Sequence, residues 1–304
     1  MSKIGFLTDS CSDIPQELAD KYGIEVVGFP INLDGVEYME RKDFTNDQFY
    51  QMMRDAQGVP TTAAITQLQF CDIYARYADE GYTDLVYLSI NAGGSSTYNN
   101  AVKAMELLEE ERPGYTMKIQ VIDSHTYSMP YGWYFCECAR KVHNGGELAS
   151  CVAELKQKLD CVEICLAAYS LKQMKKSGRV SAAAAVVGDL LGIRPIISLN
   201  AGVSKVESKV RGDAAVPAAM IKWVESRVDS MKDTPYMVGL HVQHLQARRA
   251  CQGLQKGIRP CAGHCVPAGR RCQRQHRPRR HRHRLRGQAP QSRGLCAGAA
   301  VTVL

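Results

Sequence analysis

A short stretch in the first third of the chain, SINAGGSSTY, combines residue types that can hold an anion. Gly93 and Gly94 would let the backbone approach a ligand closely. Hydroxyl groups follow at Ser95, Ser96 and Thr97, where the pattern changes from an apolar run to a helix. Unpaired N–H groups and the positive end of a helix dipole would favour an oxyanion there. A flexible turn and an ordinary helix N-cap would give the same pattern, so that interpretation stays open.

Two further loops place hydroxyl groups between a strand pattern and a helix pattern. Thr61 and Thr62 lie in GVPTTAAIT, ahead of a helix predicted around residues 67–79, and LTDSCSD follows the first apolar run. In open α/β sheets, ligands bind beyond the carboxyl ends of the strands, where such loops gather. These loops are therefore the candidates for a binding site.

The residues that could carry catalysis lack the sequence context that catalysis needs. Ser10, Ser95 and Ser124 lie outside any G-x-S-x-G sequence. His125 and His143 are the only histidines before residue 241, and they have no metal-ligand spacing. No P-loop and no G-x-G-x-x-G sequence occurs. We therefore expect a binding protein without catalytic residues, a metal ion or a nucleotide cofactor.

Alternating strand and helix patterns must position these loops. Strands are predicted in KIGFL, IEVVGFPINL, DLVYLSI, KIQVIDS, VEICLAA and RPIISL, and helices in SDIPQELADKYG, in DQFYQMM and over residues 67–79, 97–111 and 181–191. Asp34-Gly35 predicts a tight turn, and Thr45 with Gln48 predicts a capping box. The order predicts a two-lobed α/β fold with open sheets and flanking helices. Residues 1–160 would form the lobe with the ligand loops, and residues 161–242 the second lobe.

Seven segments in register resemble one known family. They are LTDSCSDIP, VVGFPINLDGVEY, VPTT, GYTDLVYLSINAGGSSTY, VIDS, LKQMKKSGRVSAAAAVVGDLLGIRPII and KVESKVRG. In order and spacing they are similar to the DegV family over about residues 3–242. The resemblance implies a bacterial fatty-acid-binding protein, the carrier subunit that presents a fatty acid to a fatty acid kinase.

The resemblance also implies which residues hold the fatty acid. The family's carboxylate-binding Thr and Ser fall on Thr62 and Ser95 of this chain. The other residues that we assign to the site are Thr61, Asn91, Gly94 and Ser96. The chain departs from the family's polar loops at Ala63-Ala64-Ile65 and at Asn91-Ala92, so fewer hydroxyl groups would face the ligand. We expect Thr62 and Ser95 to converge on one carboxylate, because each loop should leave the same sheet edge and open a helix.

The implied partners are a long-chain fatty acid and the catalytic subunit of a fatty acid kinase. Arg179 and Arg211 match positions expected on the surface that meets the kinase, although a helix-capping salt bridge would also explain Arg179. The kinase would supply the nucleotide, so this chain would be a carrier and not an enzyme. No secretory leader and no apolar run of about 18 residues is present, so we expect a cytoplasmic protein without a membrane span.

The last 64 residues differ in composition from the rest of the chain. All 31 Asp and Glu lie before residue 241, whereas 14 of the 38 Lys and Arg and six of the eight His lie after residue 240. The segment has no aromatic residue and includes the run RRHRHRLRG. Such a segment buries too little apolar surface to offset its ordering entropy, so we expect residues 243–304 to be disordered. The strand at residues 236–240 would then form an unpaired edge in the first lobe.

A shift in the reading frame near residues 242–250 would explain the composition. Read one nucleotide later with GC-rich codons, Arg271–Leu285 becomes a sequence with Thr-Gly-Pro followed by alternating Ala and Ile, which is similar to the family's ending. A nucleic-acid-binding arm is the alternative, but no aromatic residue is present to stack on bases. An inactive truncated product is another. A zinc site at Cys261, His264, Cys265 and Cys272 is a further alternative.

Overall fold

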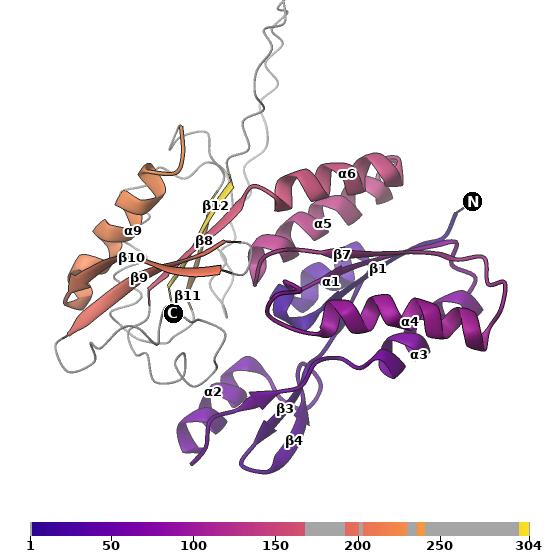
Figure 1. Ribbon diagram of the computed structural model, residues 1–304, viewed down its shortest axis with the longest axis horizontal. Helices are drawn as coiled ribbons and strands as arrows, with labels where there is room; N and C mark the ends of the chain where they lie inside the picture. Colours follow the sequence, from indigo (N-terminus) through magenta and orange to yellow (C-terminus); the bar gives the residue numbers. More distant parts are fainter. Residues whose placement is uncertain (1, 168–191, 201–202, 230–235, 241–297, 304) are drawn as a thin grey trace, which may run out of the picture.

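The computed structural model contains two lobes and a small third sheet (Figure 1). It describes residues 2–167, 192–200, 203–229, 236–240 and 298–303. Both lobes combine a sheet with packed helices, which confirms the predicted two-lobed α/β architecture.

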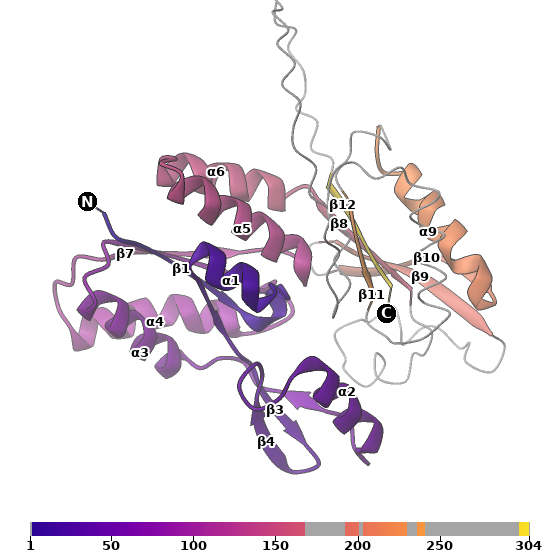
Figure 2. The ribbon, with the colours of Figure 1, turned by 180° about the vertical axis from the view of Figure 1, so that it is seen from behind.

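A four-stranded parallel sheet forms the centre of the first lobe. Its strands are, in spatial order, β2 (Ile24–Val27), β1 (Ile4–Asp9), β6 (Asp84–Ser89) and β7 (Lys118–Asp123). One face packs against α1 (Gln16–Tyr22), α5 (Met129–His143) and α6 (Leu148–Leu159), and the other against α3 (Gln67–Asp79) and α4 (Thr97–Glu111) (Figures 1 and 2). Because helices cover both faces, the central strands are apolar at consecutive positions: Leu85, Val86, Tyr87 and Leu88 are all fully buried.

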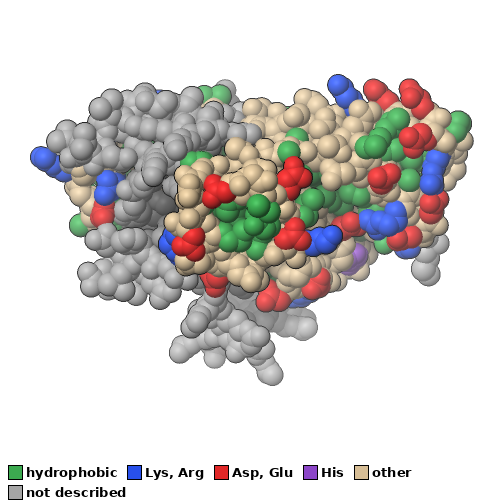
Figure 3. Space-filling view, turned by 90° about the horizontal axis from the view of Figure 1, so that it is seen from below, with side chains coloured by type: hydrophobic (Ala, Val, Ile, Leu, Met, Phe, Trp, Pro, Cys, Tyr) green, Lys and Arg blue, Asp and Glu red, His purple; other side chains and the backbone are tan. Residues whose placement is uncertain are grey.

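Along the chain, a small antiparallel sheet is inserted between β2 and β6 of the parallel sheet. It contains β4 (Val36–Met39), β3 (Pro30–Leu33) and β5 (Thr61–Thr62), and α2 (Asn46–Asp55) lies beside it. The predicted turn joins β3 to β4, with φ of 52° at Asp34 and 85° at Gly35. The predicted capping box of Thr45 and Gln48 begins α2. Seen from below, hydrophobic side chains gather over this part between acidic side chains (Figure 3).

The second lobe contains a five-stranded mixed sheet. Its spatial order is β10 (Val203–Arg211), β9 (Ile193–Asn200), β8 (Val162–Ala167), β12 (Gly298–Val303) and β11 (Tyr236–Leu240). The short η3 (Asp213–Ala215) precedes α9 (Val216–Glu225), which packs on this sheet. Cys165, Ile196, Met220 and Trp223 form its buried core. The helix predicted over residues 181–191 lies outside the described residues.

Two expectations about the end of the chain are wrong. Residues 298–303 were expected to lack ordered structure, but they form β12, which pairs in parallel with both β8 and β11. The strand at residues 236–240 therefore has a partner, and it belongs to the second sheet instead of the first lobe. The physical reason is local composition, because GAAVTV has no Arg and contains β-branched residues that suit a strand. Residues 241–297 lie outside the described part of the chain.

In the part of the chain that the structure describes, no helix combines the length and apolar character needed to cross a bilayer.

Candidate carboxylate-binding site

The candidate site lies where the parallel strands of the first lobe end. Asp9, Ser89 and Asp123 are the last residues of β1, β6 and β7, and β6 and β7 pair so that Ser89 lies opposite Asp123. The loops after these strands therefore meet at the carboxyl edge of the sheet, which is where open α/β sheets bind ligands. The loop after β6 leads into α4 and contains the residues predicted to bind an anion.

Asn91 shapes this loop, to which we refer as the head-group loop (residues 91–96). Its backbone carbonyl accepts a hydrogen bond from the Gly94 N–H at 3.0 Å, and its side-chain oxygen accepts one from the Gly93 N–H at 3.1 Å. Its amide nitrogen donates to the Tyr127 hydroxyl at 2.9 Å. Asn91 is 3% exposed, so these bonds form in a shielded environment. Asn91 thus fixes the turn that carries Gly94 and Ser95 toward α4.

Gly94 permits a close approach between the head-group loop and the loop after β7. A Cβ atom at this position would lie 2.5 Å from the Tyr127 hydroxyl, which is shorter than any normal contact. At the neighbouring Gly93, a Cβ would meet nothing closer than 3.5 Å. A side chain at position 94 would therefore require the Tyr127 side chain or the loop to move, whereas one at position 93 would not.

The N-terminus of α4 presents hydroxyl groups and backbone donors. Ser96, the N-cap residue, is exposed and caps no N–H with its side chain. The half-buried Ser95 hydroxyl lies 2.8 Å from the Thr97 hydroxyl and accepts a hydrogen bond from the Thr97 N–H at 3.3 Å. The first N–H groups of a helix have no intrahelical partner, and the dipole makes this end attractive to a carboxylate. This end of α4 could hold an anion without a metal or a cofactor.

Thr61 and Thr62 lie in a different sheet from the one expected. They form β5, which pairs with Ile31 and Asn32 of β3 in the small antiparallel sheet, and both are exposed. The expectation that Thr62 and Ser95 leave the same sheet edge is therefore wrong, because β5 is not part of the parallel sheet.

The segment after β5 nevertheless reaches the start of α4. The Asn100 side chain, one turn into α4, donates to the Ile65 carbonyl at 2.8 Å. Only Ala63 and Ala64 lie between Thr62 and Ile65, so the two Cα atoms are at most about 11 Å apart. That Thr62 and Ser95 contact one carboxylate stays a prediction.

Sequence reasoning missed Asp9, which is fully buried at the end of β1. Its carboxylate accepts hydrogen bonds from the Tyr131 hydroxyl at 2.6 Å, the Ile90 N–H at 2.7 Å, the Tyr87 hydroxyl at 3.1 Å and the Cys11 N–H at 3.1 Å. Burial raises the pKa of Asp9 to about 6, although these hydrogen bonds act in the opposite direction. The only sequence signal was the polar loop LTDSCSD after an apolar strand.

Ser10 connects the parallel sheet to the small sheet. Its hydroxyl donates to the Glu40 carboxylate and accepts a hydrogen bond from the Phe29 N–H at 3.2 Å. Burial is the largest cause that raises the pKa of Glu40. A Cβ at Gly28 would lie 2.2 Å from the Glu40 carbonyl, so the two segments pass very close. The small sheet is thereby anchored beside the carboxyl edge of β1.

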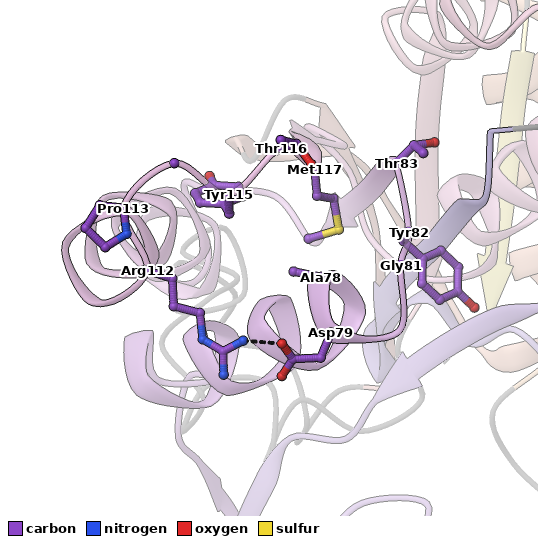
Figure 4. Close-up of a pocket in the computed structure, with 11 residues that line it drawn as sticks. Ala78, Asp79, Gly81, Tyr82, Thr83, Arg112, Pro113, Tyr115, Thr116 and Met117 are labelled. Atoms are coloured by element: carbon purple, nitrogen blue, oxygen red, sulfur yellow. Dashed lines mark hydrogen bonds and ion pairs between the residues drawn. The ribbon is translucent and has the colours of Figure 1, made fainter.

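A separate pocket of about 480 Å³ lies at the opposite end of the parallel sheet (Figure 4). Thr83 and Thr116, which precede β6 and β7, line it together with the Arg112–Asp79 ion pair. It is therefore remote from the head-group loop, and we do not assign it to the same ligand.

Of the two arginines predicted to meet a partner, Arg211 lies in the described part of the chain. Arg211 is exposed and ends β10, opposite Ile193 of β9. Arg179 and the cysteines and histidine of the alternative zinc site lie outside the described residues. Within the described part, no three His, Cys, Asp or Glu residues are grouped to hold a metal ion.

Comparison with known proteins adds a decisive match. The family model described as "Uncharacterised protein, DegV family" matches residues 3–271, which is most of the chain. The chain belongs to the DegV family. The family match extends past residue 242, at which the resemblance of the seven sequence segments ends. A DegV domain-containing protein of Caldanaerobacter subterraneus is 29% identical over 234 residues, covering 77% of this chain and 78% of the relative. One from Staphylococcus aureus is 30% identical over 210 residues, covering 69% and 71%.

Solved DegV structures have the same fold. A DegV protein of Thermus thermophilus, described by its fatty acid binding, has a TM-score of 0.69 at 25% identity and covers 84% of this chain and 89% of its own. A stearic-acid-binding protein of Eubacterium ventriosum has a TM-score of 0.72 at 21% identity, covering 85% and 88%. At 21% identity, the similarity to the Eubacterium ventriosum protein shows a shared fold only.

Proposed function

We propose that this DegV protein binds a long-chain fatty acid and holds its carboxylate at the head-group loop. The observation that carries the proposal is the α4 N-terminus at the carboxyl edge of a parallel sheet, where the Ser95 hydroxyl lies beside Ser96, an N-cap residue whose side chain caps no N–H group. The fatty acid binding described for the Thermus thermophilus relative supports the same ligand class. Thr62 would contribute a second hydroxyl from β5.

The two ends of a fatty acid contribute to binding in different ways. Burial of each methylene group contributes about 0.8 kcal/mol, so the acyl chain supplies most of the affinity. Hydroxyl and N–H donors at the head group stabilise the charged carboxylate and fix its orientation. The protein would therefore determine how the carboxylate is presented.

We further propose that the bound carboxylate is presented to a partner kinase, which supplies the nucleotide and phosphorylates it. Arg211, exposed at the end of β10, and Arg179 are proposed to meet this partner. A charged carboxylate aimed at solvent is the nucleophile that phosphoryl transfer requires. On this proposal the chain is a non-catalytic carrier located in the cytoplasm.

The combined substitution Thr62→Ala and Ser95→Ala tests the head-group assignment. Each charge-assisted hydrogen bond is worth about 1.5–3 kcal/mol, so we expect the loss of two to weaken stearate binding by at least about 100-fold. The measurement is displacement of a fluorescent fatty acid from delipidated protein. The matched control is Thr83→Ala with Thr116→Ala, which removes two hydroxyls from the remote pocket. Equal affinity of the first variant and wild type, or a larger loss in the control, would refute the assignment.

A further inference from the structure

We propose that Asp9 positions the head-group loop for the fatty acid carboxylate. The inference rests on the proposed function, because the loop is taken to be the carboxylate-binding element. Asp9 does not belong to the loop, and nothing in the structure gives its carboxylate access to a ligand, since it is fully buried. It acts through Ile90, the residue directly before the loop.

The two oxygens of Asp9 serve different sides of the site. Oδ2 accepts hydrogen bonds from the Ile90 N–H at 2.7 Å and the Tyr87 hydroxyl at 3.1 Å, which both belong to the β6 side. Oδ1 accepts hydrogen bonds from the Tyr131 hydroxyl at 2.6 Å and the Cys11 N–H at 3.1 Å. One carboxylate thus joins β1, the start of the head-group loop and α5.

This arrangement requires a carboxylate with two accepting oxygens. An amide at position 9 has one accepting oxygen and one nitrogen that carries two protons. If the nitrogen faced Ile90, its protons would confront the Ile90 N–H, which can only donate, and turning the amide round would create the same conflict with the Cys11 N–H. The hydroxyls of Tyr87 and Tyr131 could rotate to accept, so the two backbone N–H groups decide the conflict. A buried donor without an acceptor is costly, so the amide could keep only one side in place.

The Ile90 hydrogen bond controls where the head-group loop begins. Ile90 is followed directly by Asn91, whose bonds to Gly93 and Gly94 set the turn that delivers Ser95 to the α4 N-terminus. The Ala92 N–H is held separately by Asp123 Oδ1 at 3.1 Å. Asp9 therefore fixes the residue before the loop and Asp123 the second residue of the loop, and of the two carboxylates only that of Asp9 is fully buried.

The groups around Asp9 define how its charge responds to pH. Tyr131 faces it from α5, Tyr87 from β6 and Cys11 from the short η1 helix (Ser10–Ser12). Glu40, Asp13 and Arg41 act on Cys11 from farther out. Burial raises the pKa of Asp9 to about 6. Below that pH the carboxylate gains a proton, and one of its two accepting oxygens becomes a hydroxyl that donates.

The experiment compares stearate binding by delipidated full-length protein and its Asp9→Asn variant between pH 5 and pH 7.5. We expect the variant to bind about tenfold more weakly at pH 7.5, the size expected for one charge-assisted hydrogen bond. The ratio of the two affinities should approach one as pH falls through about 6, because wild-type Asp9 then also has a single accepting oxygen. Titration of stearate itself affects both proteins and cancels in the ratio.

If Asp9→Asn does not fold, Tyr131→Phe is the second variant, because it removes a hydroxyl group and keeps the aromatic ring. Loss of the Tyr131 donor should weaken binding and move the midpoint of the pH profile upward, since that hydrogen bond lowers the pKa of Asp9. The matched control is Tyr77→Phe, which also removes a tyrosine–carboxylate bond, to Glu25, but leaves Asp9 untouched. A pH profile that is unchanged in Tyr131→Phe, or a ratio for Asp9→Asn that is constant with pH, would overturn the positioning role. Wild-type protein that takes up no stearate would instead refute the proposed function.

Discussion

Gly93 and Gly94 are adjacent residues with opposite tolerance of a side chain. Gly94→Ala places a Cβ 2.5 Å from the Tyr127 hydroxyl, whereas Gly93→Ala makes only ordinary contacts. We expect Gly94→Ala to lower the free energy of unfolding by about 1–3 kcal/mol and to weaken stearate binding, because the Tyr127 side chain or the head-group loop must shift. Gly93→Ala should change stability by less than about 0.5 kcal/mol. Thermal unfolding and stearate titration of both variants check this, and equal behaviour would contradict the loop geometry.

Individual site residues were only partly predictable from the sequence. The Gly and Ser residues of the head-group loop stand out because their types are contiguous and have a direct chemical meaning. Asp9 does not stand out, because its importance comes from Tyr131, which is 122 residues away, and from Tyr87. Sequence patterns do not pair such distant side chains. The role of Asn91 was missed for the same reason, since it depends on Tyr127 in another loop.

The regular elements were easier to predict than the irregular ones. The predicted helices over residues 67–79 and 97–111 match α3 and α4, because helical periodicity and N-terminal polar residues define them locally. The sequence predicts a loop where β5 lies, because two residues cannot show the period of a strand. β12 was missed because the basic composition around it dominated the segment.

β12 gives a prediction about the second sheet. It lies between β8 and β11 and pairs in parallel with both, so a chain that ends at residue 297 would leave two strand edges without a partner. We expect this truncation to lower the free energy of unfolding by several kcal/mol and to promote aggregation. Differential scanning calorimetry and light scattering measure the two effects. A truncated protein with the wild-type melting temperature would show that the pairing of β12 is not needed.

The whole chain combines a DegV fold with a basic segment of different composition. All acidic residues precede residue 241, and the family match continues to residue 271. The hypothesis of a shifted reading frame stays a prediction, and the DNA sequence around codons 240–250 checks it. A one-base correction that restores an acidic, apolar C-terminus should also raise the melting temperature, because the last part of the fold would regain its native sequence. A gene that encodes the present segment without any such correction would refute the hypothesis.

Fatty acid binding is the central claim for the molecule, and native mass spectrometry of the full-length protein tests it most directly. Protein purified from bacteria should carry one long-chain fatty acid, and after delipidation it should take up one stearate per chain. Circular dichroism of the same sample establishes that it is folded. A folded sample that carries no fatty acid and takes up no stearate would contradict the account.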